Sequence, residues 1–193
     1  MIKLLISDLD DTLYDWTGFF VPAFYAMADE IARMTGIDEK KLLNEYMAAH
    51  QRLGSVEYPY ATLELPSIMA YYNNAPAEEM KAALRPAFNV FNSVRESHLH
   101  LLPGVEEMLR ALTEMGVTLI AYTESSKENG FYRLMKLGIE PYFKHVYTFE
   151  SQFKSAYAVS EKVRTVQTKK PDVAVIERIC AGEGYDKSEV MYL

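Results

Sequence analysis

The chain begins with a short apolar segment, IKLLIS (residues 2–7), that ends directly in a cluster of acidic residues. A nearly continuous apolar run of this length is typical of a strand buried on both faces of a parallel sheet. The acidic residues follow within one short stretch: Asp8, Asp10, Asp11 and Asp15. Because like charges this close repel each other, the cluster indicates either a solvated turn or a site that attracts a cation.

Other segments of the chain continue the pattern of an α/β protein. Short apolar runs typical of buried strands recur at 117–123, 145–149 and 189–193. Amphipathic helical patterns lie before and between them, at 103–116, 125–138 and 172–184. This alternation predicts a doubly wound, Rossmann-like α/β fold with a parallel sheet.

One of these helices can be described further from its residues. Ser125 or Ser126 can cap the start of the helix within 125–138. Phe131, Leu134 and Met135 are predicted to face inward.

Residues 16–99 break the alternation, because no convincing buried strand occurs there. A stripe of apolar residues ends at Gly36, and Asp38 is placed to cap the next helix. Two further helices are expected at 67–73 and 77–98, the second with a kink at Pro86. We therefore expect an all-helical domain inserted into an α/β core made of residues 1–15 and 100–193.

Composition excludes several classes of protein. The 193 residues are 49% hydrophobic, enough to bury a full core. The net charge of −7 leaves no basic excess for nucleic acid or an anionic membrane. The single cysteine excludes an internal disulfide and fits a reducing cytoplasm. No stretch reaches the ~18 apolar residues of a membrane span, so a cytoplasmic protein is expected, with its oligomeric state open.

The carboxyl ends of parallel strands are where such sheets bind ligands. The first strand ends in Asp8 and Asp10, the second in Thr123 and Glu124, and a basic stretch at 154–170 follows the third. Carboxylate oxygens bind a hard cation, while hydroxyl, amide and ammonium groups hold phosphate oxygens. The combination predicts a site for a phosphoryl group and a magnesium ion.

The same residues resemble the motifs of a known superfamily. DLDDTLYD (8–15) after a short apolar strand resembles the first motif, DxDxT, of the haloacid-dehalogenase-like (HAD) superfamily. Thr123 at the end of VTLIAYT resembles its second motif, and Lys170-Pro171 its third. The segment LLPGVEEMLRALTEMG (101–116) is similar to the usual approach to the second motif, so the resemblance covers nearly the whole chain.

The resemblance assigns different roles to the clustered carboxylates. Asp8 would be the nucleophile that forms an aspartyl-phosphate, and Asp10 would protonate the leaving oxygen and then help to activate water. Magnesium would be held by a carboxylate oxygen of Asp8 and the backbone carbonyl of Asp10. Asp11 and Asp15 are interpreted as solvated or helix-capping residues.

The resemblance also implies which groups bind the substrate's phosphate. Thr12, Thr123 and the backbone amide of Glu124 would bind it, and Lys170 would neutralise charge on Asp8 and the phosphoryl group. The substrate would be a small phosphorylated metabolite.

The identity of the third-motif lysine has alternatives. The stretch 149–169 is longer than is usual before this motif, so Lys154 or Lys169 could replace Lys170. Pro171 directly after Lys170 favours Lys170.

Within the superfamily, an acid at position 10 favours phosphate-ester hydrolysis over dehalogenation, because dehalogenases have no alkoxide leaving group to protonate. A phosphomutase keeps both aspartates and stays possible, as does a non-catalytic phosphate-binding or interaction protein. The helical insert at 16–99 resembles the C1 cap of the family, a lid that selects the substrate. Tyr14, Trp16, Phe19 and Phe20 lie where such a cap could meet the substrate.

The fourth motif of the family, Gly-Asp with further acids that complete the magnesium shell, should directly follow EVMYL (189–193). The sequence stops at Leu193. We expect the gene to continue with such acids; the alternative is a natural protein with a weakened metal site. Residues 1–193 alone are expected to bind magnesium poorly and to turn over slowly.

Overall fold

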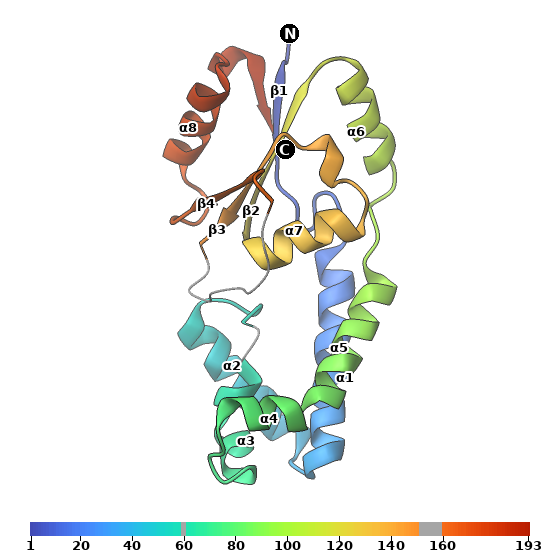
Figure 1. Ribbon diagram of the computed structural model, residues 1–193, viewed down its shortest axis with the longest axis vertical. Helices are drawn as coiled ribbons and strands as arrows, with labels where there is room; N and C mark the ends of the chain where they lie inside the picture. Colours follow the sequence, from blue (N-terminus) through green and yellow to red (C-terminus); the bar gives the residue numbers. More distant parts are fainter. Residues whose placement is uncertain (59–60, 151–159) are drawn as a thin grey trace. The chain divides into compact units, whose positions relative to one another are not determined.

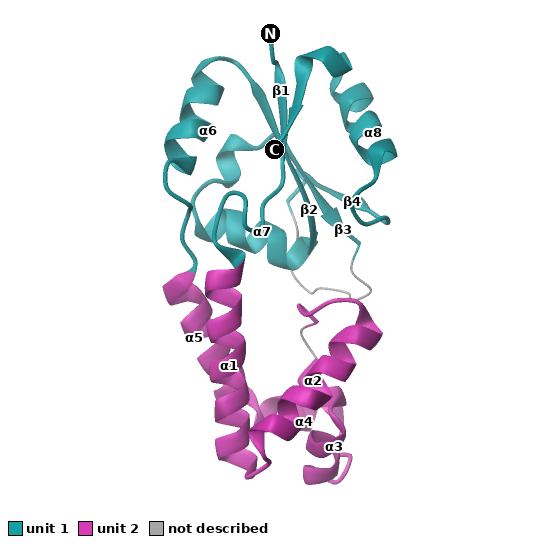
Figure 2. Cartoon of the chain, turned by 180° about the vertical axis from the view of Figure 1, so that it is seen from behind, with its two compact units in different colours: residues 1–16, 99–193 teal, residues 17–98 magenta. Residues whose placement is uncertain are grey.

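The structure is a computed structural model and describes residues 1–58, 61–150 and 160–193. The chain divides into two compact units, one made of residues 1–16 and 99–193 and the other of residues 17–98 (Figure 2). Each of the two boundaries between the units lies one residue away from the boundary expected from the sequence.

The first unit is built on a parallel sheet (Figure 1). Its strands pair in the order β4-β3-β2-β1-β5, so β1 and β2 lie side by side near its middle. The bounds are β1 Leu4–Ser7, β2 Thr118–Ser126, β3 His145–Phe149, β4 Val163–Val166 and β5 Val190–Tyr192. All four residues of β1 are buried, as its apolar run predicts. The predicted doubly wound α/β fold is confirmed.

Helices cover both faces of this sheet (Figure 1). On one face lie α6 (Val105–Glu114) and α7 (Lys127–Lys136), and on the other α8 (Val173–Glu183). The apolar side of α8 packs on β1, β2 and β4 in one cluster of buried residues: Leu4, Ile6, Ile120, Tyr122, Val166, Val175, Ile179 and Cys180. The three helices agree with the predicted helical patterns.

Strand β4 does not appear in the sequence prediction. It has only four residues, and its sequence VRTV places two polar side chains between the valines. Among the strands that the structure describes, β4 lies at the edge of the sheet, where polar residues are tolerated. Such a segment lacks the continuous apolar run by which buried strands are recognised.

The predicted inward face of α7 is partly wrong. Leu134 is buried as expected, but the Met135 side chain is 62% exposed. The helix instead buries Gly130, Arg133 and Leu134, which follow the i, i+3, i+4 spacing of one helical face. A buried arginine therefore occupies a position that the hydrophobic pattern assigns to the polar side.

The second unit contains only helices within the described residues. Asp38 caps α2 by accepting a hydrogen bond from the Lys41 N–H, as predicted. The expected kinked helix at 77–98 is instead two helices that meet at Leu84, since Pro86 cannot continue a helix but fits its first turn. The bounds are α1 Trp16–Thr35, α2 Glu39–Leu53, α3 Pro66–Tyr71, α4 Ala77–Ala83 and α5 Arg85–His98. Nowhere in the described parts of the chain is a helix both long and apolar enough to cross a membrane.

Candidate active site

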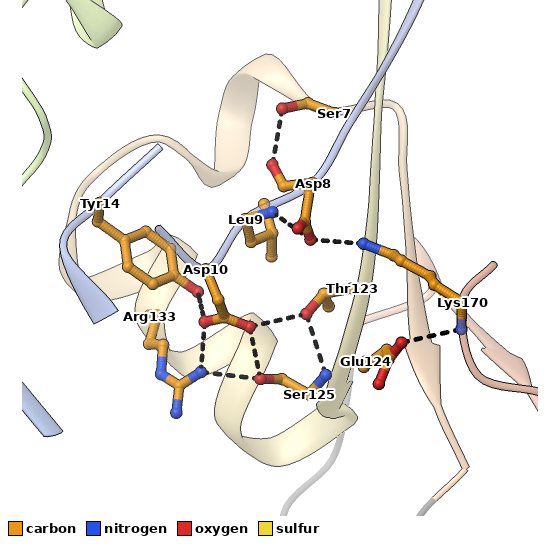
Figure 3. A network of polar contacts seen from close by, with 10 residues as sticks. All are labelled: Ser7, Asp8, Leu9, Asp10, Tyr14, Thr123, Glu124, Ser125, Arg133 and Lys170. Carbon is orange, nitrogen blue, oxygen red and sulfur yellow. Dashed lines mark hydrogen bonds and ion pairs between the residues drawn. The ribbon is translucent and has the colours of Figure 1, made fainter. Parts of the chain in front are cut away.

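Asp8 and Lys170 meet at the carboxyl end of β1 (Figure 3). The ammonium Nζ of Lys170 lies 2.5 Å from Oδ1 of Asp8, although the residues are 162 positions apart. The same oxygen accepts a 2.8 Å hydrogen bond from the Leu9 N–H. Asp8 directly follows a buried strand, so its backbone is fixed while its carboxylate stays partly open to solvent.

Two contacts fix the backbone that carries Lys170. Its N–H donates to the carboxylate of Glu124 at 2.8 Å, which ties this loop to β2. Asp172, two residues on, caps α8 by accepting from the N–H groups of Ala174 and Val175. A hydrogen bond from the Thr168 hydroxyl lowers the pKa of Asp172, so the cap stays charged near neutral pH.

The alternative lysines are placed differently. The ammonium of Lys169 lies 5.8 Å from the ring centroid of Phe149. Lys154 falls outside the described residues. Of Lys169 and Lys170, the two that the structure describes, Lys170 contacts Asp8.

The carboxylate of Asp10 has its own set of partners (Figure 3). Oδ1 accepts from the Tyr14 hydroxyl at 2.7 Å and from Nη1 of Arg133 at 2.8 Å. Oδ2 accepts from the hydroxyls of Thr123 at 3.0 Å and Ser125 at 2.8 Å. Both oxygens therefore act as acceptors, which is the arrangement of an ionised carboxylate.

One of these donors cannot exchange roles with Asp10. Arg133 has only N–H donors, and its side chain is 4% exposed. Burial, and then the nearby Asp10 carboxylate, raise the pKa of Tyr14 well above its usual value, so the phenol keeps its proton. The hydroxyls of Tyr14, Thr123 and Ser125 can rotate, and each can also accept.

Sequence reasoning missed the contributions of Arg133, Ser125 and Tyr14. Tyr14 was expected to lie where a cap could meet the substrate. It is instead fully buried, and its hydroxyl donates a hydrogen bond to Asp10. Ser126 is the N-cap of α7, whereas Ser125 still belongs to β2 and points to Asp10. The helical spacing of Gly130, Arg133 and Leu134 is the signal in the sequence that could have placed Arg133 inward.

The predicted phosphate-binding residues lie on two segments of this edge. Thr123 ends the apolar part of β2, where its hydroxyl donates to Asp10 and accepts from the Ser125 N–H. Thr12 lies in the turn after β1 and its N–H donates to the Leu9 carbonyl at 3.2 Å. Glu124 contributes its carboxylate to the Lys170 backbone rather than to an open position.

Oxygen atoms for a cation are few here. Among the described residues, no group of three or more acidic, histidine or cysteine side chains gathers closely enough to hold a metal. The Asp8 carboxylate and the Asp10 carbonyl remain two hard oxygen donors of the kind that Mg²⁺ takes. Because Mg²⁺ commonly keeps several waters and one or two protein carboxylates, this small donor set is compatible with it.

Gly130 lets α7 approach β2 closely enough to bring Arg133 to Asp10. A Cβ at this position would lie 3.2 Å from the Thr123 methyl group. Gly130→Ala is expected to lower the free energy of unfolding by about 1 kcal/mol. Overpacking costs ~1–3 kcal/mol, and the higher helix propensity of alanine returns about 1 kcal/mol. Urea unfolding measures the difference.

Gly182 in α8 is the matched control, because a Cβ there meets nothing within 4 Å. Gly182→Ala should stabilise the fold by about 0.5–1 kcal/mol through helix propensity. If both alanine variants were equally stabilised, the close contact between α7 and β2 would not exist.

A parallel α/β sheet that gathers two aspartates and a lysine at its carboxyl edge is an arrangement suited to phosphoryl transfer. The family model of the haloacid dehalogenase-like hydrolases matches residues 2–193. The chain therefore belongs to this hydrolase family.

One curated protein resembles the chain in sequence, and two solved structures resemble it in fold. The glyceraldehyde 3-phosphate phosphatase of Pyrococcus abyssi is 26% identical over 152 residues, which is 76% of this chain. The match spans only 59% of that relative's length. A 2-haloacid dehalogenase from Pseudomonas syringae superimposes with a TM-score of 0.63 at 23% identity, over 100% of this chain and 77% of its own. A structure described as a β-phosphoglucomutase from Thermotoga maritima gives 0.62 at 21%, over 99% and 75%.

Proposed function

We propose that the protein is a phosphoric monoester hydrolase that acts on a small phosphorylated metabolite through an aspartyl-phosphate. The observation that carries the proposal is the contact between Asp8 and Lys170 at the end of β1. This contact joins the carboxylate that we propose as the nucleophile to an ammonium group, and a second carboxylate, Asp10, follows two residues later.

In the first step, a carboxylate oxygen of Asp8 attacks phosphorus and forms an acyl-phosphate bond. The bond from phosphorus to the leaving alkoxide oxygen breaks, and Asp10 in its protonated form gives that oxygen a proton. Lys170 stabilises the negative charge on the phosphoryl oxygens.

In the second step, water attacks the phosphorus of the aspartyl-phosphate. Asp10, now ionised, takes a proton from that water, and the bond to Asp8 breaks. Inorganic phosphate leaves, Asp8 returns as a carboxylate, and Asp10 is again protonated.

The hydrogen bonds of Asp10 set a condition on the first step. In the structure both of its oxygens accept hydrogen bonds, so a proton on one of them requires a donor to turn away. Arg133 cannot do this, whereas the hydroxyls of Tyr14, Thr123 and Ser125 can rotate. We infer that one of these hydroxyls changes direction when Asp10 carries its proton.

Magnesium is part of the proposal. The carboxylate of Asp8 and the backbone carbonyl of Asp10 would hold the ion. A bound magnesium ion would offset the negative charge that accumulates when a phosphate ester meets two carboxylates.

The proposal extends to the substrate class, the role of the helical unit and the location of the protein. The curated relative from Pyrococcus abyssi carries the name of a phosphatase for a three-carbon sugar phosphate, which favours a small metabolite as the substrate class. The helical unit 17–98 is proposed to act as a C1-type cap. A cytoplasmic location fits the acidic composition with its single cysteine.

The test is release of inorganic phosphate from an aryl phosphate and from glyceraldehyde 3-phosphate. We expect turnover of both, and a loss of about 10²-fold or more when EDTA removes divalent cations. Added Mg²⁺ should restore the rate, whereas added Ca²⁺ with its longer and more flexible coordination should not.

The products separate the alternatives. An isomerised ester without free phosphate would identify a phosphomutase. Binding of phosphate without any turnover would identify a non-catalytic protein and would contradict the proposal.

A further inference from the structure

Tyr122 and Thr123 are neighbours in β2, and their side chains lie on opposite faces of the sheet because strand side chains alternate. Thr123 faces α7, where Gly130 packs against it. Tyr122 is 1% exposed and packs in the cluster that α8 forms on the other face. Lys170 lies in the loop directly before α8 and reaches the site from this side.

The ammonium of Lys170 lies close to two aromatic rings. Its Nζ is 4.8 Å from the ring centroid of Tyr122 and 5.9 Å from that of Tyr192. A cation within ~6 Å of such a centroid is attracted by the negative face of the ring. The same Nζ is 2.5 Å from Asp8, and the Lys170 side chain is only 18% exposed. The ammonium is therefore held between a carboxylate and an aromatic face.

The position of the Tyr122 ring is not explained by a hydrogen bond of its hydroxyl. The hydroxyl is buried and finds no hydrogen-bond partner in the described part of the chain. A buried hydroxyl without a partner destabilises a fold, so the contribution of Tyr122 to the site comes from the ring itself.

Lysine needs such a support more than arginine would. Its ammonium sits on a flexible stem with considerable rotamer entropy, and it has no planar fork to fix it on a carboxylate. A ring face against the ammonium restricts the positions of the ammonium. Unlike a second carboxylate, the ring carries no net charge and leaves the positive charge of the lysine in place.

We propose that Tyr122 is a positioning residue, whose ring face holds the ammonium of Lys170 on Asp8, with a weaker contribution from Tyr192. The inference rests on the proposed function, in which Lys170 stabilises charge on the phosphoryl group. It assigns to β2 two separate contributions: Thr123 on one face and the support of Lys170 on the other.

The test compares two rings of nearly equal shape and opposite electrostatic character. Tyr122→Phe removes the unpaired hydroxyl and keeps the ring face, so we expect kcat/KM to stay within about two-fold. Pentafluorophenylalanine at the same position keeps the ring but removes its negative face. We expect this second change to lower kcat/KM by about 5- to 30-fold, the range of a partly desolvated cation–π contact.

A double-mutant cycle gives a readout that does not depend on turnover. The equilibrium constant of unfolding in urea is measured for both rings, with Lys170 and in the Lys170→Met variant. Fluorination of the ring should raise the unfolding constant more when Lys170 is present than in the Lys170→Met variant. We expect the two increases to differ by a factor of about 5 to 30, because the cycle cancels all effects of the two changes except the coupling between the ring and the ammonium. Tyr192→Leu should give a smaller coupling because its ring lies further from Nζ.

The outcomes separate this inference from the proposed function. Absence of coupling in the cycle would overturn the inference whatever the protein catalyses. Coupling together with equal kcat/KM for the two rings would show a contact that does not position Lys170 for catalysis, and would also overturn it. Coupling in a protein that releases no phosphate would leave the contact supported and would contradict the proposed function alone.

Discussion

Replacing Asp8 by asparagine is expected to reduce phosphate release on the order of 10⁴- to 10⁶-fold, the size of effect that follows removal of a nucleophile. Asparagine has nearly the same shape, and its amide oxygen can still accept from the Leu9 N–H and from Lys170. It cannot form the acyl-phosphate, because it lacks the ionised oxygen that attacks phosphorus. Steady-state release of inorganic phosphate measures the loss.

The fold should survive Asp8→Asn. The ion pair with Lys170 is partly exposed, with side-chain exposures of 31% and 18%, so its loss should cost no more than about 1 kcal/mol. Urea unfolding of the variant checks this directly. A large loss of stability would mean that Asp8 is a structural residue.

Asp11→Asn is the matched control, with the same chemical change in the same motif. Asp11 has a φ of 55° in the turn after β1, and asparagine tolerates this left-handed conformation. We expect activity within about two-fold of the unchanged protein. Equal losses for the two variants would contradict the separate roles assigned to these carboxylates.

The parts of the site that could be predicted from the sequence are those fixed by strand ends. A buried strand is visible as an apolar run, and the residue after it must lie at the edge of the sheet. Asp8 and Thr123 could therefore be placed before the fold was known, and the parallel pairing of β1 with β2 brings their strands together. Lys170 was favoured over Lys154 and Lys169 only by the proline that follows it, because it lies in a loop whose path no periodicity describes.

The partners of Asp10 could not be predicted, because they depend on the exact phase and depth of α7. The helix has a polar sequence, KENGFYRLMK, in which an arginine is ordinarily assigned to the solvent side. The close approach of Gly130 to Thr123 turns Arg133 into the interior, where Asp10 compensates its charge. Edge strand β4 escaped prediction for a related reason, since its pairing rather than its composition makes it a strand.

Arg133→Met is expected to lower the free energy of unfolding by about 2–3 kcal/mol. Removal of one partner from a fully buried ion pair costs ~3–5 kcal/mol. The Asp10 side chain is 25% exposed and would keep three other donors, which reduces the expected loss. Methionine fills much of the volume of the arginine stem, so the loss reports mainly the charge and its hydrogen bonds.

Arg110→Met in α6 is the control for loss of an arginine at the surface, where the change should stay within about 0.5 kcal/mol. The double variant Arg133→Met with Asp10→Asn should be less destabilised than the sum of its parts, since no unpaired charge is left behind. Strict additivity of the two changes would contradict the pairing.

The same variant should also respond to the chemistry of the leaving group. If Arg133 fixes the carboxylate that delivers the proton, Arg133→Met should slow an alkyl phosphate much more than a dinitrophenyl phosphate, whose leaving oxygen needs no proton. A structural defect alone would slow both substrates equally. The quantity to compare is the ratio of kcat for the alkyl phosphate to kcat for the dinitrophenyl phosphate. A fall in this ratio in Arg133→Met indicates that Arg133 positions Asp10, and an unchanged ratio indicates that it only packs α7 against the sheet.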